Sequence, residues 1–149
     1  MTQFSMEEEI KESIRLVKEG IKESREFLVE IENNISNKEQ LSQLIFSFPF
    51  ERYKDKIVFT LEKNSGGIAR FLADNKYENM KIVEDLFKEG LAIDRWCGSN
   101  LFTLPDDLKE RTRVVLGFIE RTKTYLNKVE NFIEEVEEFQ KIKTRQNIR

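Results

Sequence analysis

The chain has 149 residues, of which 39% are hydrophobic and 36% are charged, and its formal net charge is −3. That balance fits one domain with a core of ordinary size and argues against a general nucleic-acid binder. The sequence contains no histidine and a single cysteine, Cys97, which excludes histidine-based acid–base catalysis and an internal disulfide.

An apolar stripe with helical spacing predicts a long first helix over residues 6–34. The segment Ser5-Met6-Glu7-Glu8 has the pattern of a capping box at its start. Ser13 and Gly20 flank the stripe, and their small size would let a neighbouring backbone approach closely. The stripe residues follow one another at intervals of four and three, with Ser24 in the one polar position: Ile10, Ile14, Val17, Ile21, Ser24, Leu28, Ile31 and Ile35.

Two shorter helices are expected next. Ser36-Asn37-Lys38-Glu39 is a second capping box, and it opens a short helix that ends at Pro49. Pro49 also suits the first turn of a third helix, whose helical spacing continues to Leu61. The segment 57–61 is rich in β-branched and aromatic residues, but no second strand candidate exists to pair with it, so helix is favoured.

A break in the helical pattern is expected at Asn64-Ser65-Gly66-Gly67, because two glycines inside a helix would cost about 2 kcal/mol. A fourth helix begins at the cap-like segment Asn75-Lys76-Tyr77-Glu78. It either extends to Cys97 or ends early at Gly90, and the sequence leaves both alternatives open.

The longest predicted helix covers Pro105 to about Lys143, with Thr103 or Leu104 as its cap. At ~1.5 Å per residue it would be nearly ~60 Å long. A helix of that length needs an equally long partner, from the same chain or from a second copy, so a homodimer is slightly favoured over a monomer. Its stripe again has one polar position, Thr122: Val115, Phe118, Thr122, Tyr125, Val129, Phe132, Val136 and Phe139.

These patterns predict an all-α fold, an antiparallel helical bundle with long N- and C-terminal helices and shorter helices between them. We expect a single domain over residues 1–149, with frayed ends at 1–4 and 144–149. No apolar run approaches the ~20 residues that span a bilayer, and the acidic N-terminus has no signal-peptide pattern. A cytoplasmic protein without membrane contact is therefore expected.

Motifs for catalysis and metal binding are incomplete. Glu8-Glu9-x-x-Glu12 and Glu134-Glu135-x-x-Glu138 match half of the magnesium motif of helical nucleotide pyrophosphohydrolases, but no aspartate follows a glutamate by three residues. Cys97, beside Trp96, is interpreted as buried packing rather than as a reactive thiol. We therefore predict no enzymatic activity, no metal and no cofactor. A small-ligand-binding or carboxylate- and Mg-dependent enzyme is kept as an alternative.

The leading hypothesis is a non-enzymatic protein-interaction module, such as a regulator, an inhibitor, an immunity-type protein or a small assembly subunit. The most hydrophobic run of the chain is 44–50. Buried, it would plug one end of the bundle, which we favour; exposed, it would be a partner site. Two apolar segments supply the candidate partner-binding residues, Phe46, Phe48, Phe50, Leu101 and Phe102.

A second hypothesis is a nucleic-acid-associated subunit. No acid follows Glu138, so the end of the chain is basic. Its candidate contacts to phosphate are Lys141, Lys143, Arg145 and Arg149. Further bases on the last helix could touch phosphate, but acids interleave them, so we interpret them as an ordinary salt-bridged surface: Lys109, Arg111, Arg113, Arg121, Lys123 and Lys128.

Overall fold

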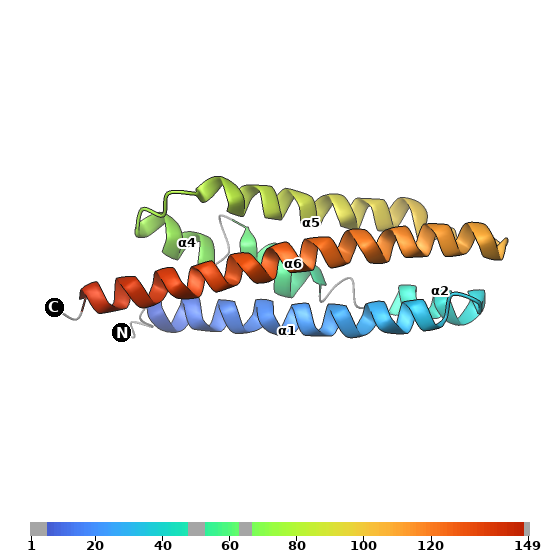
Figure 1. Ribbon diagram of the computed structural model, residues 1–149, viewed down its shortest axis with the longest axis horizontal. Helices are drawn as coiled ribbons and strands as arrows, with labels where there is room; N and C mark the ends of the chain where they lie inside the picture. The colour runs from blue at the N-terminus through green and yellow to red at the C-terminus, as the bar shows by residue number, and fades with distance from the viewer. Residues whose placement is uncertain (1–5, 48–52, 63–66, 148–149) are drawn as a thin grey trace.

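Four antiparallel rods of helix lie side by side in this protein (Figure 1). The computed structural model describes residues 6–47, 53–62 and 67–147. Three rods are single helices, and the second is assembled from short pieces. In chain order the elements are α1 (Met6–Asn33), then α2 (Lys38–Ser47), η1 (Lys54–Val58), η2 (Phe59–Leu61) and α4 (Gly67–Asp74) of the segmented rod, then α5 (Met80–Asn100) and α6 (Leu108–Asn147). The predicted all-α class is confirmed, and no strand occurs within these described ranges.

The stripes of α1 and α6 face the same core along the length of the bundle. Both polar positions within them are buried, with Ser24 8% and Thr122 3% exposed. Two ion pairs join the helices across their seam, Lys18 with Glu137 at 2.8 Å and Arg25 with Glu130 at 2.8 Å. The pairs are seven residues apart on each helix, as a constant antiparallel register requires. The long partner that α6 needs is therefore α1 of the same chain, with α5 beside it.

The middle of the segmented rod packs between two glycines. A side chain on Gly20 of α1 would lie 2.8 Å from Ile57 of η1, and one on Gly90 of α5 would lie 2.7 Å from Val58. Ile57 and Val58 are adjacent in sequence, yet both are fully buried. Their side chains contact different helices, Ile57 beside Gly20 of α1 and Val58 beside Gly90 of α5. Gly20 thus allows a neighbouring segment to approach α1 closely, as its small size predicted.

The starts of two helices differ from the predicted ones. Asn37, not Ser36, caps α2, since its Oδ1 accepts a hydrogen bond from the Gln40 amide at 3.0 Å. Asp107 caps α6 in the same way through the Glu110 amide at 3.0 Å, so neither Thr103 nor Leu104 is the cap. A short side chain that accepts from the N3 amide is the preferred N-cap in both cases.

The helix ends also depart in detail from the sequence pattern. The chain becomes extended at Glu62 and returns to helix at Gly67, as the expected break requires. Asn75 closes α4 instead of opening α5, and Lys76 follows in the left-handed conformation with φ 57°. Gly90 does not end α5, which continues to Asn100. Helix α6 continues through 144–147, which we expected to fray, whereas 1–4 lie outside the described residues.

Candidate functional site

Two exposed phenylalanines meet at the distal end of the bundle, where α1 leads into α2 and α5 leads into α6 (Figure 1). Phe46 of α2 is 64% exposed, and Phe102, just after α5, is 39% exposed. Their ring centroids are 4.9 Å apart with a tilt of 41°. We call this ring pair the distal aromatic patch. Leu108, at the start of α6, is a further apolar residue that is 51% exposed.

This arrangement corrects part of the sequence interpretation. Phe46 does not plug the end of the bundle, and the core positions beside it are taken by Ile45 and Leu101, each 1% exposed. Leu101 is therefore a core residue rather than a partner-binding one. Phe48 and Phe50 lie outside the described residues.

Arg111 holds together the two loops that carry the patch. Its guanidinium is buried, with the residue 5% exposed, and it donates to backbone carbonyls on both sides. From the loop after α1 the acceptors are Ile35, at 2.8 Å, and Ser36, at 3.4 Å. From the loop before α6 they are Pro105, at 3.1 Å, and Asp106, at 2.9 Å. The planar fork of arginine suits this many acceptors in fixed directions.

A surface ion pair adds to this link between the loops. Lys38 at the start of α2 pairs with the Asp106 carboxylate. The hydrogen bond from Lys38 lowers the pKa of Asp106 below its usual value. The sequence interpretation placed Arg111 among exposed bases and missed its role. One signal could have found it: Arg111 precedes Val115 by four residues, so it lies in phase with the buried stripe of α6.

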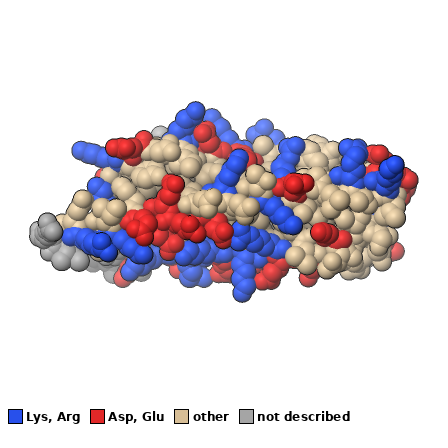
Figure 2. Space-filling view, viewed as in Figure 1, with Lys and Arg blue, Asp and Glu red and all other residues tan. Residues whose placement is uncertain are grey.

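On the face seen in Figure 2 the right-hand third is mostly tan, with blue and red side chains along its upper edge. Two further exposed apolar side chains belong to the long helices, Val29 at 59% and Leu116 at 43%. Leu116 and Ile119 line a shallow groove of about 390 Å³ against Glu32 of α1. Exposed large apolar side chains that are rimmed by charged and polar ones are typical of protein-binding sites.

The basic residues expected to contact nucleic acid do not all lie on one surface. Lys141 and Arg145 line a groove between α1 and α6. Lys143 lies over the Phe139 ring at 5.4 Å instead, and Arg149 is outside the described residues. The bases farther along α6 are dispersed too. Arg113 pairs with Glu110, Arg121 lies over Trp96, and Lys128 pairs with Glu89.

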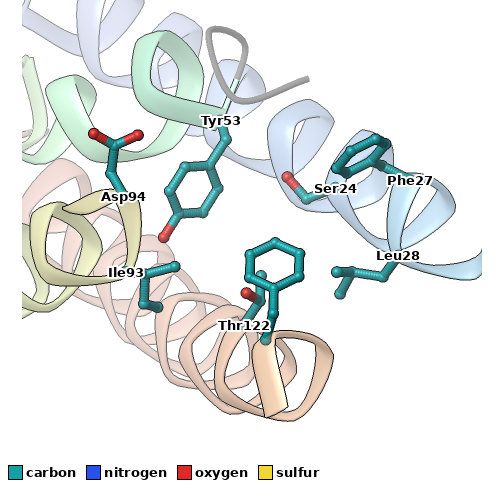
Figure 3. Close-up of a pocket in the computed structure, with 8 residues that line it drawn as sticks. Ser24, Phe27, Leu28, Tyr53, Ile93, Asp94 and Thr122 are labelled. Carbon is teal, nitrogen blue, oxygen red and sulfur yellow. The ribbon is translucent and has the colours of Figure 1, made fainter. Parts of the chain in front are cut away.

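A small, partly open cavity lies between α1, the start of η1, α5 and α6 (Figure 3). Its volume of about 20 Å³ suits one water molecule and no larger ligand. Ser24 and Thr122, the polar positions of the two stripes, both line it, together with Tyr53 and Asp94. The hydroxyls of Tyr53 and Thr122 are buried without a hydrogen-bond partner, while Asp94 pairs with Lys54 at 3.0 Å. The cavity gives no support to the small-ligand alternative.

The thiol of Cys97 is buried, with the residue 1% exposed. Burial raises its pKa, and the nearby Asp94 carboxylate adds to the shift, so the thiolate that reacts as a nucleophile is disfavoured. Cys97 is thus a packing residue, as interpreted. Glu12, one of the glutamates of the incomplete magnesium motif, pairs with Arg15 at 2.6 Å. Within the described residues, no three side chains of the metal-ligating types His, Cys, Asp or Glu come together.

No family model, curated protein or solved structure matches this chain. Its function is therefore argued from its own residues. None of the helices in the described part of the chain combines the length and apolar character needed to cross a bilayer.

Proposed function

We propose that this chain is a non-enzymatic protein-interaction module that binds its partner through the distal aromatic patch. The observation that supports this most directly is the contact between Phe46 and Phe102, which are 64% and 39% exposed. Exposed aromatic side chains are expensive to leave in water, and they are enriched at the centres of protein interfaces.

The rigidity of the distal end also supports the proposal. Arg111 fixes the loops on either side of the patch through four carbonyls, so the two rings are positioned before a partner arrives. A preformed patch loses less conformational entropy on binding than a mobile one. The partner best suited to it presents an apolar or aromatic side chain with few charges around it.

Site-specific photo-crosslinking in the native host tests this proposal. Phe46 is replaced by photoreactive benzoylphenylalanine, and adducts are identified by mass spectrometry. We expect one dominant protein adduct, which Phe102→Ser in the same chain reduces strongly because it removes half of the ring pair.

The matched control places the same photoreactive residue at Ile142, which is 48% exposed near the opposite end of the bundle. It should give no such adduct. Equal labelling from both positions, or no adduct from position 46, would count against the patch as a binding site. Phe102→Ser changes an exposed residue, so an unchanged melting temperature should confirm that the variant folds.

A further inference from the structure

The end of the bundle opposite the distal patch has a groove with its own chemistry. The groove holds about 620 Å³ between α1 and α6, a volume in the range of small-molecule sites. One acid, Glu137, lines it. Five bases line it as well, from both helices: Lys11, Arg15, Lys18, Lys141 and Arg145. This excess of positive charge is local, because the chain as a whole has a formal net charge of −3.

The charges of the groove are only partly neutralised by the protein. Arg15 pairs with Glu12 and Glu19, at 2.6 and 2.8 Å. Lys18 pairs with Glu137 at 2.8 Å, and Lys141 pairs with Glu138 at 3.7 Å. Within the described residues, neither Lys11 nor Arg145 makes an ion pair. An anion entering the groove would thus meet a cation on each wall that no carboxylate occupies.

Gln140 supplies a second, independent feature of the groove. Its side chain is 9% exposed and lines the groove, and in the described part of the chain no hydrogen bond involves its amide. The amide atoms are not among the fully buried unpaired ones, so they face the groove and can donate to a ligand there in place of water. Gln140 follows Val136 by four residues, so the buried stripe of α6 ends here in a polar residue directed to the groove.

We propose that this groove binds a compact polyphosphate, with Lys11 and Arg145 contacting phosphate oxygens and the Gln140 amide donating to one of them. A compact ligand fits better than a nucleic-acid strand. The basic wall from Lys11 to Lys18 is only ~10 Å long at ~1.5 Å per residue. A strand continuing along the same seam would enter the adjoining groove, which lacks the excess of positive charge because four acids and three bases line it: Glu26, Glu130, Glu134, Glu137, Lys18, Lys22 and Arg25. Figure 2 shows blue side chains at the end of the bundle where α6 ends and a red cluster beside them.

Calorimetric titration of the full chain with sodium tripolyphosphate tests the proposal. We expect saturable one-to-one binding that weakens as salt is raised, because the contacts are ionic. The double variant Lys11→Gln/Arg145→Gln should bind about tenfold more weakly, as the loss of two solvent-exposed ionic contacts predicts. Gln140→Leu should weaken binding about tenfold, as the loss of one hydrogen bond to a charged group predicts.

The matched control is Lys109→Gln/Arg95→Gln, which removes the same two charges from exposed positions outside the groove. It should leave the affinity nearly unchanged. All the substituted bases are exposed, so unchanged melting temperatures are expected and would show that the variants fold. Equal weakening in the groove and control variants would overturn the proposal, as would absence of binding to the wild-type chain.

Two further ligands, ATP and a single-stranded oligonucleotide, test whether the groove recognises a free polyphosphate, a nucleotide or a nucleic-acid strand. The groove lining contains no aromatic side chain on which a base could stack, so ATP should bind no more tightly than tripolyphosphate. A single-stranded oligonucleotide should bind more weakly per phosphate group, because it must pass the acids of α6. Tight oligonucleotide binding with weak tripolyphosphate binding would overturn the proposal in favour of a nucleic-acid site.

Discussion

Among the glycines that the structure describes, Gly90 is the one at which an added side chain would lie closest to another atom. A side chain there would lie 2.6 Å from the Tyr125 hydroxyl and 2.7 Å from Val58. That hydroxyl is buried without a hydrogen-bond partner, and burial raises the pKa of Tyr125. Gly90 is therefore kept in the middle of α5 for space, although glycine costs a helix interior about 1 kcal/mol relative to alanine.

We expect Gly90→Ala to destabilise the fold by about 2 kcal/mol, because overpacking outweighs the gain in helix propensity. Tyr125→Phe alone should be neutral or stabilising by about 1 kcal/mol, since it removes an unpaired buried hydroxyl. In the Tyr125→Phe background the cost of Gly90→Ala should fall, because the closest atom is gone. Urea denaturation of all four chains measures this coupling. Strictly additive effects would contradict the predicted contact between position 90 and the hydroxyl.

At the scale of elements, Arg111 joins α6 to the loops on both sides of the distal patch. Arg111→Met keeps the length of the side chain but leaves the carbonyls of Ile35, Pro105 and Asp106 without their donor. The expected loss is about 3 kcal/mol in the free energy of unfolding. Hydrogen exchange should quicken in 34–41 and 101–108 before other segments. Arg113→Met, which removes an exposed arginine of α6, should change stability by no more than about 0.5 kcal/mol.

The ion pairs between η1 and α1 make the stability of the fold depend on pH in the acid range. Lys56 of η1 pairs with Glu19 at 2.6 Å and with Glu23 at 2.9 Å. The hydrogen bond from Lys56 lowers the pKa of Glu19 below its usual 4.5. A carboxyl with a lowered folded pKa stabilises the fold above its unfolded pKa, and this contribution is lost as the pH falls through the folded value. The Glu12, Asp106 and Glu130 carboxyls are shifted in the same direction by their basic partners.

We therefore expect the urea midpoint to be constant from neutral pH down to about 4.5, the usual glutamate pKa, and to decline below it. Lys56→Met should make this decline shallower, because Glu19 then loses its main partner. Lys81→Met, which changes an exposed lysine of α5, should leave the slope as in the wild type. A wild-type midpoint that rises on acidification would be inconsistent with the lowered pKa values.

The long helices were predictable because each carries one periodic signal over many turns. Ser24 and Thr122 interrupt the two stripes at single polar positions, and both prove to face one cavity. The segmented rod was less predictable, since the close packing of η1 uses the space left by Gly20 and Gly90 on other helices. Arg111 and Gln140 were missed for another reason. Each continues the stripe of α6 in phase, but sequence reasoning counted only apolar residues as buried.

At the scale of the whole molecule, the two ends of the bundle differ in chemistry. The distal end exposes aromatic and aliphatic side chains, and the opposite end has the basic groove between α1 and α6. One long helix, α6, runs from one end to the other (Figure 1). The apolar stripe of α6 is buried against other helices of the same chain. A second copy of the chain is therefore not needed to cover this long helix. A homodimer remains a prediction, and the distal patch is now the surface that would form it.

Light scattering coupled to size-exclusion chromatography tests that prediction. We expect a particle of about twice the 17.8 kDa chain mass at high concentration, dissociating on dilution because a patch built around two phenylalanines buries little area. Phe46→Ser should shift the equilibrium to the 17.8 kDa monomer, since it removes the more exposed ring. Ile142→Ser, which changes an exposed apolar residue near the opposite end, should have no effect. A wild-type chain that stays at 17.8 kDa at every concentration would refute the homodimer, and it would leave a different protein as the partner of the patch.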